Sequence, residues 1–132
     1  MDEKLIRALI AAAKAARKNS YSPYSRFKVG AALLAKSGRI YAGANVENAS
    51  YGLTLCAERV ALATAVSAGA RKFSAIAVVG KDARFLSPCG ACRQMLAEFG
   101  TALKVVMRDA KGKIVIKSIE DLLPLSFGPH SL

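Results

Sequence analysis

Residues 73–80 form an apolar run that only Ser74 interrupts with a polar side chain. The run shows none of the alternation between polar and apolar residues that a half-buried strand would show. A continuous run of this kind is typical of a strand that is covered on both faces of its sheet. We therefore expect a central sheet with helices packed against both of its faces.

Helix-like and strand-like segments alternate along the rest of the chain. Residues 2–18 carry apolar side chains at helical spacing and begin with acidic residues, which favours a helix start. Ser87 and Pro88 suit the N-cap and the first residue of a later helix. The expected helices are residues 2–18, 56–68 and 87–99, with a short last helix after a capping-box match at Ser118; the expected strands are residues 29–35, 39–45, 73–80, 104–108 and 113–117.

The last two expected strands are joined by residues 109–112 alone. A parallel crossover needs a dozen or more residues, so this connection predicts an antiparallel pair. We therefore expect an α/β fold with three layers, α/β/α, around a mixed five-stranded sheet. With 132 residues the chain has the length of one domain, which we place at residues 1–132.

The chain is strongly basic, with 20 Lys and Arg against 9 Asp and Glu and a net charge of +11. This balance suits a nucleic-acid partner, because basic residues neutralise phosphates. The basic residues are scattered, however, and only Arg17-Lys18 and Arg71-Lys72 are adjacent. Because the sequence has no basic block and no aromatic-basic pattern, we interpret the charge as a solvated surface and expect no nucleic-acid partner.

No segment of the sequence is typical of a membrane span or a secretory signal. The longest uncharged runs, residues 60–70 and 122–132, contain eleven residues each, whereas a membrane span needs about 20. The N-terminal segment carries Lys4, Arg7 and Lys14 within its apolar stretch, unlike a signal peptide. We expect a soluble, cytoplasmic protein without a membrane partner.

The candidate chemistry lies on three cysteines near the starts of expected helices: Cys56, Cys89 and Cys92. Residues three apart on a helix point in directions about 60° apart, so Cys89 and Cys92 can face one point. Helix N-termini favour thiolates, because their unpaired N–H groups carry partial positive charge. Three thiolates form a soft site that suits zinc. Arg59 is placed to offset their excess negative charge, although a surface ion pair would also explain this residue.

The cysteines could also serve roles other than a catalytic zinc site. A disulfide would leave an odd thiol, and unrelated buried cysteines would make the two helix-start positions a coincidence. A structural zinc site needs four protein ligands, and His130 near the C-terminus is the remaining candidate for the fourth. Three protein ligands with an open fourth position are the catalytic arrangement, which we favour.

Four stretches carry a resemblance to a known family. They are Tyr-Ser-Arg-Phe-Lys-Val-Gly-Ala-Ala at residues 24–32, Asn-Val-Glu-Asn-Ala-Ser-Tyr-Gly at residues 45–52, Cys-Ala-Glu-Arg at residues 56–59 and Pro-Cys-Gly-Ala-Cys at residues 88–92. In order and spacing they resemble the small, zinc-dependent cytidine deaminases, and the resemblance covers essentially the whole chain. That family hydrolyses cytidine or deoxycytidine to the uridine nucleoside and ammonia. Its Asn-Val-Glu-Asn segment separates the nucleoside deaminases from their nucleic-acid-editing relatives.

The resemblance implies one zinc ion per subunit, held by the three cysteines, and a zinc-activated water that attacks C4 of the pyrimidine. It implies that Glu58 takes a proton from this water and delivers protons to N3 and to the leaving amine. In an ideal helix Glu58 would point about 160° away from Cys56, so either the first turn is irregular or Cys56 sits at the cap.

The resemblance also implies a homotetramer that acts in pyrimidine salvage. The substrate-binding groups that it implies are Phe27 against the pyrimidine, Asn45 and Glu47 at the ribose hydroxyls, backbone groups near Ala57, and Tyr51 and Phe127 from neighbouring subunits. From the residues alone, core packing would also explain Phe27, and turn chemistry would also explain Asn45 and Glu47.

Three functions compete: a nucleoside deaminase, a deaminase of RNA or DNA, and a non-catalytic binding module that zinc stabilises. The short connection at residues 109–112 counts against the second, because the superfamily's nucleic-acid editors place a helix there. Deaminases of other aminopyrimidine nucleosides, such as blasticidin S, share most of the motifs. The nucleoside deaminase is the function that we expect.

Overall fold

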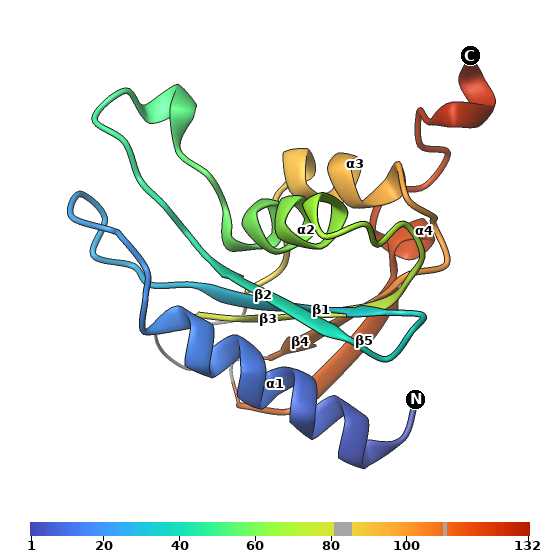
Figure 1. Cartoon of the computed structure of the whole chain (residues 1–132), viewed down its shortest axis with the longest axis horizontal. Coiled ribbons are helices and arrows are strands. Elements are labelled where there is room, and N and C mark those ends of the chain that lie inside the picture. Colours follow the sequence, from blue (N-terminus) through green and yellow to red (C-terminus); the bar gives the residue numbers. More distant parts are fainter. Residues whose placement is uncertain (81–85, 110) are drawn as a thin grey trace.

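The computed structural model describes residues 1–80, 86–109 and 111–132. Five strands form one sheet in the order β2-β1-β3-β4-β5 (Figure 1). Strand β1 runs antiparallel to β2 and β3, β3 runs parallel to β4, and β4 runs antiparallel to β5, so the sheet is mixed as expected. The strands are β1 Gly30–Ala35, β2 Ile40–Ala44, β3 Phe73–Val79, β4 Lys104–Arg108 and β5 Ile114–Ser118.

Helices cover both faces of this sheet, which confirms the three-layer prediction. Helix α1 crosses one face, and α2 and α3 lie on the other (Figure 1). Strand β1 is buried along its whole length, with Leu33 in the core under α2 and α3 and Leu34 in the core under α1. The helices are α1 Glu3–Arg17, α2 Ala57–Ser67, α3 Gly90–Ala97 and α4 Ile119–Leu122, with single 3₁₀ turns at Tyr51–Leu53 and Pro129–Ser131.

Two glycines allow the helices to approach the sheet closely. A Cβ atom on Gly30 would collide with the carbonyl oxygen of Ala13 in α1. A Cβ atom on Gly43 would lie 2.5 Å from the amide nitrogen of Ala61 in α2. Because α2 packs backbone against backbone on β2, the start of α2 is held at a defined height above the sheet.

The start of α3 differs from the prediction. The N-cap is Cys89 rather than Ser87, and the helix ends at Ala97 rather than at Phe99. At the start of the helix the difference follows from a contact within this segment: the guanidinium of Arg93 donates hydrogen bonds to the Ser87 hydroxyl at 3.1 Å and to the Pro88 carbonyl at 2.8 Å. These bonds hold the serine outside the helix, so it cannot cap the first turn.

The connection between β4 and β5 is a tight turn, as expected. Asp109 accepts backbone hydrogen bonds from Lys111 and Lys113 at 2.9 Å each. Gly112 has a φ of 84°, a conformation that glycine adopts without strain. Ala110, the remaining residue of this connection, lies outside the described residues.

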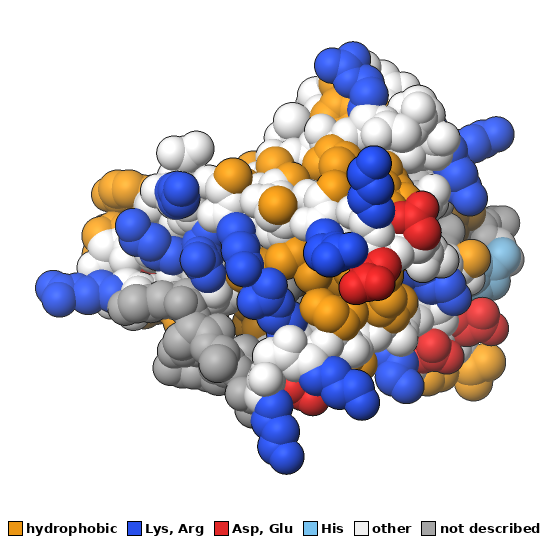
Figure 2. All heavy atoms as spheres, turned by 90° about the horizontal axis from the view of Figure 1, so that it is seen from below, with side chains coloured by type: hydrophobic (Ala, Val, Ile, Leu, Met, Phe, Trp, Pro, Cys, Tyr) orange, Lys and Arg blue, Asp and Glu red, His pale blue; other side chains and the backbone are white. Residues whose placement is uncertain are grey.

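The distribution of basic side chains on the surface bears on a possible nucleic-acid partner. On the face that α1 covers, Lys and Arg side chains are spread among apolar and acidic ones (Figure 2). This distribution agrees with the scattered basic residues of the sequence.

Among the helices of the described residues, none has the length and apolar character needed to cross a membrane.

Candidate functional site

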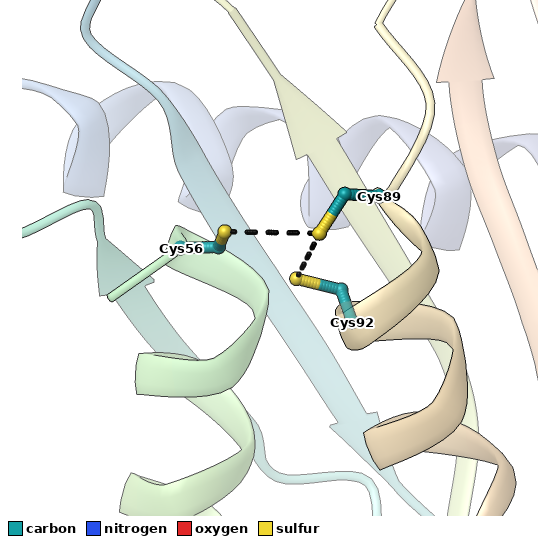
Figure 3. A group of neighbouring side chains, drawn as sticks. All are labelled: Cys56, Cys89 and Cys92. Atoms are coloured by element: carbon teal, nitrogen blue, oxygen red, sulfur yellow. Dashed lines mark hydrogen bonds between the residues drawn. The ribbon is translucent and has the colours of Figure 1, made fainter. Parts of the chain in front are cut away.

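Three cysteine side chains converge where two helices begin. Cys56 is the N-cap of α2, Cys89 is the N-cap of α3, and Cys92 lies in the first turn of α3 (Figure 3). Both caps have extended backbone, and neither side chain forms a capping hydrogen bond with its helix. Their thiols therefore point toward one another, with Sγ–Sγ distances of 4.0 Å from Cys56 to Cys89 and 3.5 Å from Cys89 to Cys92.

This cluster fits a zinc ion. All three Sγ atoms lie within 4.8 Å of one another. Thiolates at a Zn–S distance of about 2.3 Å in a tetrahedral site stand about 3.8 Å apart, which the observed distances bracket. Within the part of the chain that the structure describes, the ligand group contains these cysteines and not His130. Cys89 is exposed and Cys92 is buried, so the site opens to the surface on one side.

The electrostatic surroundings favour the ionised form of Cys56. Hydrogen bonding with Cys92, together with the hydrogen bond and positive charge of Arg59, lowers the pKa of Cys56 to about 5. The same interaction with Cys56 raises the pKa of Cys92, and burial adds to that increase. Cys56 thus supplies negative charge to the cluster, which is the property a cation site requires.

Arg59 lies directly beside the cysteine cluster. Its Nη2 atom donates a hydrogen bond to the carbonyl of Thr54 at 2.9 Å and lies 3.7 Å from Sγ of Cys56. The contact with Cys56 raises the pKa of the guanidinium further. Arg59 thus brings a fixed positive charge against the cysteine cluster.

Glu58 is the buried acid of this site. It is only 5% exposed, and Cys56 and Cys92 both act on the pKa of its carboxyl group. Burial raises the pKa of Glu58 above its ordinary value, chiefly because the charged form loses its hydration. Since Cys56 is an extended cap with a ψ of 151°, ideal helix angles do not apply between it and Glu58, and both face the same site. Ala57 between them is fully buried.

Glu47 lines a hollow of about 390 Å³ together with Tyr24, Ser25, Tyr51 and Thr54. One carboxylate oxygen of Glu47 accepts hydrogen bonds from the amides of Tyr24 at 2.9 Å and Ser25 at 3.1 Å. The other oxygen accepts a hydrogen bond from the Ser25 hydroxyl. The bond to this hydroxyl and the two amide bonds hold the pKa of Glu47 below its ordinary value. The hollow therefore presents an ionised carboxylate to solvent.

Asn45 and Phe27 contact each other, and the amide of Phe27 is bonded to Ser25, which lines this hollow. Asn45 is 9% exposed. Its Nδ2 atom donates to the carbonyl of Phe27 at 2.8 Å, and its Oδ1 atom accepts from the amide of Val29 at 3.0 Å and from the hydroxyl of Ser20. The ring of Phe27 packs on Gly80, where an added Cβ would lie 3.1 Å from the ring. Asn45 thus fixes the segment that carries Phe27.

Within a single chain, Tyr51 and Phe127 do not lie together. Tyr51 is 75% exposed and Phe127 is 62% exposed. Their segments project from opposite sides of the molecule (Figure 1). The ring of Tyr51 lies 6.0 Å from that of Tyr24, and the carbonyl of Phe127 accepts a hydrogen bond from Gln94 at 2.8 Å.

Two residues that organise the site were not predicted from the sequence. Ser25 is part of a matching motif, but nothing in its local sequence shows that its hydroxyl reaches Glu47. Arg93 follows Cys92 directly, yet its bonds to Pro88 and Leu122 depend on how the chain folds around α3. The sequence holds one indication of this role for Ser25: it lies two residues before Phe27, a spacing at which a serine hydroxyl can bind a backbone amide.

Comparison with known proteins identifies similar sequences and structures. The family model described as the cytidine and deoxycytidylate deaminase zinc-binding region matches residues 3–108. The cytidine deaminase of Sporosarcina psychrophila is 48% identical over 128 residues, covering 96% of this chain and 94% of that protein. The cytidine deaminase of Halalkalibacterium halodurans is 53% identical over 120 residues, covering 90% and 91%. The crystal structure of cytidine deaminase from Burkholderia pseudomallei superposes with a TM-score of 0.87 at 52% identity, covering 96% of this chain and 100% of that one.

Proposed function

The chain belongs to the cytidine deaminase family and is a zinc-dependent hydrolase, and we propose that it converts cytidine and deoxycytidine to uridine and deoxyuridine with release of ammonia. The observation that carries this proposal is the buried acid Glu58 beside a cluster of three thiols. A structural zinc site would need a fourth protein ligand there and would have no use for a buried acid.

Cys56, Cys89 and Cys92 would hold one zinc ion per subunit. Bound zinc lowers the pKa of a water molecule and so supplies hydroxide near neutral pH. Glu58 takes one proton of the attacking water and delivers it to N3 of cytosine, and then transfers the second proton of that water, from the new hydroxyl on C4, to the leaving amine. Its raised pKa suits this work, because a group that both accepts and donates protons works best with a pKa near the working pH. Arg59 offsets the charge of the thiolates.

We assign substrate binding to the hollow beside Glu47. Phe27 packs against the pyrimidine, and backbone groups near Ala57 bind its polar edge. Asn45 and Glu47 bind the ribose hydroxyls. Asn45 has two amide N–H groups and uses one on the Phe27 carbonyl, so one remains for the sugar.

The exposed aromatic residues support a homotetramer with shared sites. Tyr51 and Phe127 leave most of their surface uncovered, and each lies on a projecting segment. We propose that neighbouring subunits bring these rings over one another's substrate. Each subunit contributes one catalytic domain, residues 1–132, and the enzyme acts in pyrimidine salvage. We place it in the cytoplasm, because its three cysteines must stay reduced to bind metal.

The test combines a zinc measurement with an ultraviolet assay. The purified protein should contain one zinc per chain, and the absorbance of cytidine should fall as uridine forms. Full zinc content without turnover of cytidine would instead indicate a binding module. Turnover of a cytosine-containing oligonucleotide at a comparable rate would indicate an editing enzyme.

A further inference from the structure

Ser25 contacts two of the residues that we assign to substrate binding, Phe27 and Glu47. It lies in the loop between α1 and β1 and is exposed. Its hydroxyl oxygen accepts a hydrogen bond from the amide of Phe27 at 3.0 Å. The same hydroxyl donates its proton to Oε2 of Glu47, which lies 22 residues away along the chain. One hydroxyl therefore joins the residue assigned to the base and the residue assigned to the sugar.

The hydrogen bonds that Glu47 already accepts leave one acceptor position of its carboxylate for a ligand. A carboxylate offers about four acceptor positions. Both positions of Oε1 are used by the amides of Tyr24 and Ser25, and one position of Oε2 is used by the Ser25 hydroxyl. The remaining position of Oε2 suits one sugar hydroxyl, with its direction set by the three bonds already made.

The backbone around Ser25 is also held in an uncommon form. Arg26 lies between Ser25 and Phe27 and has a φ of 57°, in the left-handed region that residues other than glycine rarely adopt. The bond from the Phe27 amide to the Ser25 hydroxyl spans Arg26 and closes this turn. The turn determines where the Phe27 ring enters the site.

We propose that Ser25 is a positioning residue that fixes the carboxylate of Glu47 relative to the ring of Phe27, so that the spacing between base and sugar matches a nucleoside. This inference rests on the proposed function. Ser25 acts through Glu47 and Phe27. Its loss therefore weakens binding of substrate and transition state alike, which raises KM and leaves kcat nearly unchanged.

The experiment is a double-mutant cycle measured with cytidine. Ser25→Ala, Glu47→Gln and the double variant are compared with the parent enzyme for kcat, KM and zinc content. We expect Ser25→Ala to raise KM about tenfold, as the loss of one hydrogen bond to a charged group does. In the Glu47→Gln background the same change should add at most about twofold, because the two residues act as one unit. Ser25→Thr retains a hydroxyl and should restore KM to within about threefold of the parent value.

Ser37→Ala is the matched control, because the Ser37 hydroxyl accepts a backbone bond from Arg39 two residues later, as Ser25 does from Phe27. It lies in the β1–β2 turn and should leave kcat and KM unchanged. If the Ser25→Ala and Glu47→Gln losses simply multiply, or if Ser25→Ala lowers kcat with KM unchanged, the positioning role is wrong while cytidine turnover still stands. An inactive parent enzyme with full zinc would overturn the proposed function, and this inference with it.

Discussion

At the scale of single residues, Glu58 combines burial with proximity to the thiol cluster. A carboxyl group that is 5% exposed loses most of its hydration, and this raises its pKa. Glu47 shows the opposite behaviour, because hydrogen bonds from Ser25 and the Tyr24 amide lower its pKa. The two acids are therefore suited to different work, proton transfer for Glu58 and hydrogen-bond acceptance for Glu47.

Glu58→Gln should retain zinc and fold but lose turnover by about 10²–10⁴-fold. Glutamine preserves the shape of the side chain and cannot exchange a proton. Zinc content and cytidine kinetics measured on the same preparation check this expectation. Glu98→Gln is the control, because Glu98 is exposed at the end of α3 and should leave turnover unchanged. Turnover near the parent value with full zinc would contradict the assigned role of Glu58.

His130→Ala should leave zinc stoichiometry unchanged. The candidate ligand group contains the three cysteines and not His130, so the imidazole contributes nothing to metal binding. Metal analysis after dialysis against a weak chelator measures the effect. Loss of zinc from this variant would show that the centre is closed by a fourth protein ligand and is structural.

At the scale of secondary-structure elements, α3 connects the cysteine centre to the C-terminal segment. Arg93 donates hydrogen bonds to the carbonyls of Pro88 at 2.8 Å and Leu122 at 2.7 Å. Gln94, the next residue, donates a hydrogen bond to the carbonyl of Phe127. The turn that carries Cys89 and the tail that carries Phe127 are thus attached to one helix, so a shift of α3 would move both.

Arg93→Gln should lower the free energy of unfolding by about 1–3 kcal/mol, because part-buried carbonyls lose charged hydrogen-bond donors. Urea denaturation of the zinc-loaded protein measures this change. Arg71→Gln provides the comparison, since Arg71 is exposed and bonds to the nearby carbonyls of Val66 and Ala70. We expect it to change stability by less than about 0.5 kcal/mol. Equal effects from the two variants would show that Arg93 does not hold the elements together.

At the scale of the whole molecule, the surface charge and the site favour different ligands. The net charge of +11 attracts polyanions, and Lys and Arg side chains are spread over the face that α1 covers (Figure 2). Glu47 places a negative charge at the hollow assigned to the sugar. The basic surface can therefore attract RNA without the site accepting it.

The enzyme should deaminate cytidine and deoxycytidine but no cytosine within a single strand, at any salt concentration. A free 3′-hydroxyl can donate to Glu47, and such a charge-assisted bond contributes about 1.5–3 kcal/mol. A 3′-phosphodiester has no proton to donate and adds a second negative charge. Product analysis by chromatography at low and high salt checks this. Oligonucleotide deamination at a rate comparable with cytidine would overturn the nucleoside assignment.

Local patterns in the sequence predicted most of the elements, the mixed sheet and the cysteines of a cluster that fits zinc. The apolar run at residues 73–80 indicates a strand buried on both faces, and the short connection at residues 109–112 allows only an antiparallel pair. Neither restriction depends on the rest of the fold. The positions of the cysteines at helix starts also depend on nearby sequence, whereas the approach of Cys56 to Cys89 across 33 residues is decided by the tertiary structure. The local features could be predicted since each depends on residues close together along the chain.

Contacts between distant segments were decided by the tertiary structure alone. Ser25 meets Glu47 across 22 residues, and Arg93 binds the carbonyl of Leu122 across 29 residues. The Asn45 side chain likewise forms hydrogen bonds with the backbone of Phe27 and Val29, which only the folded chain brings near it. A serine or asparagine can bond to many backbone groups at similar free energy, so its partner is chosen by whichever group the packed fold brings within about 3 Å.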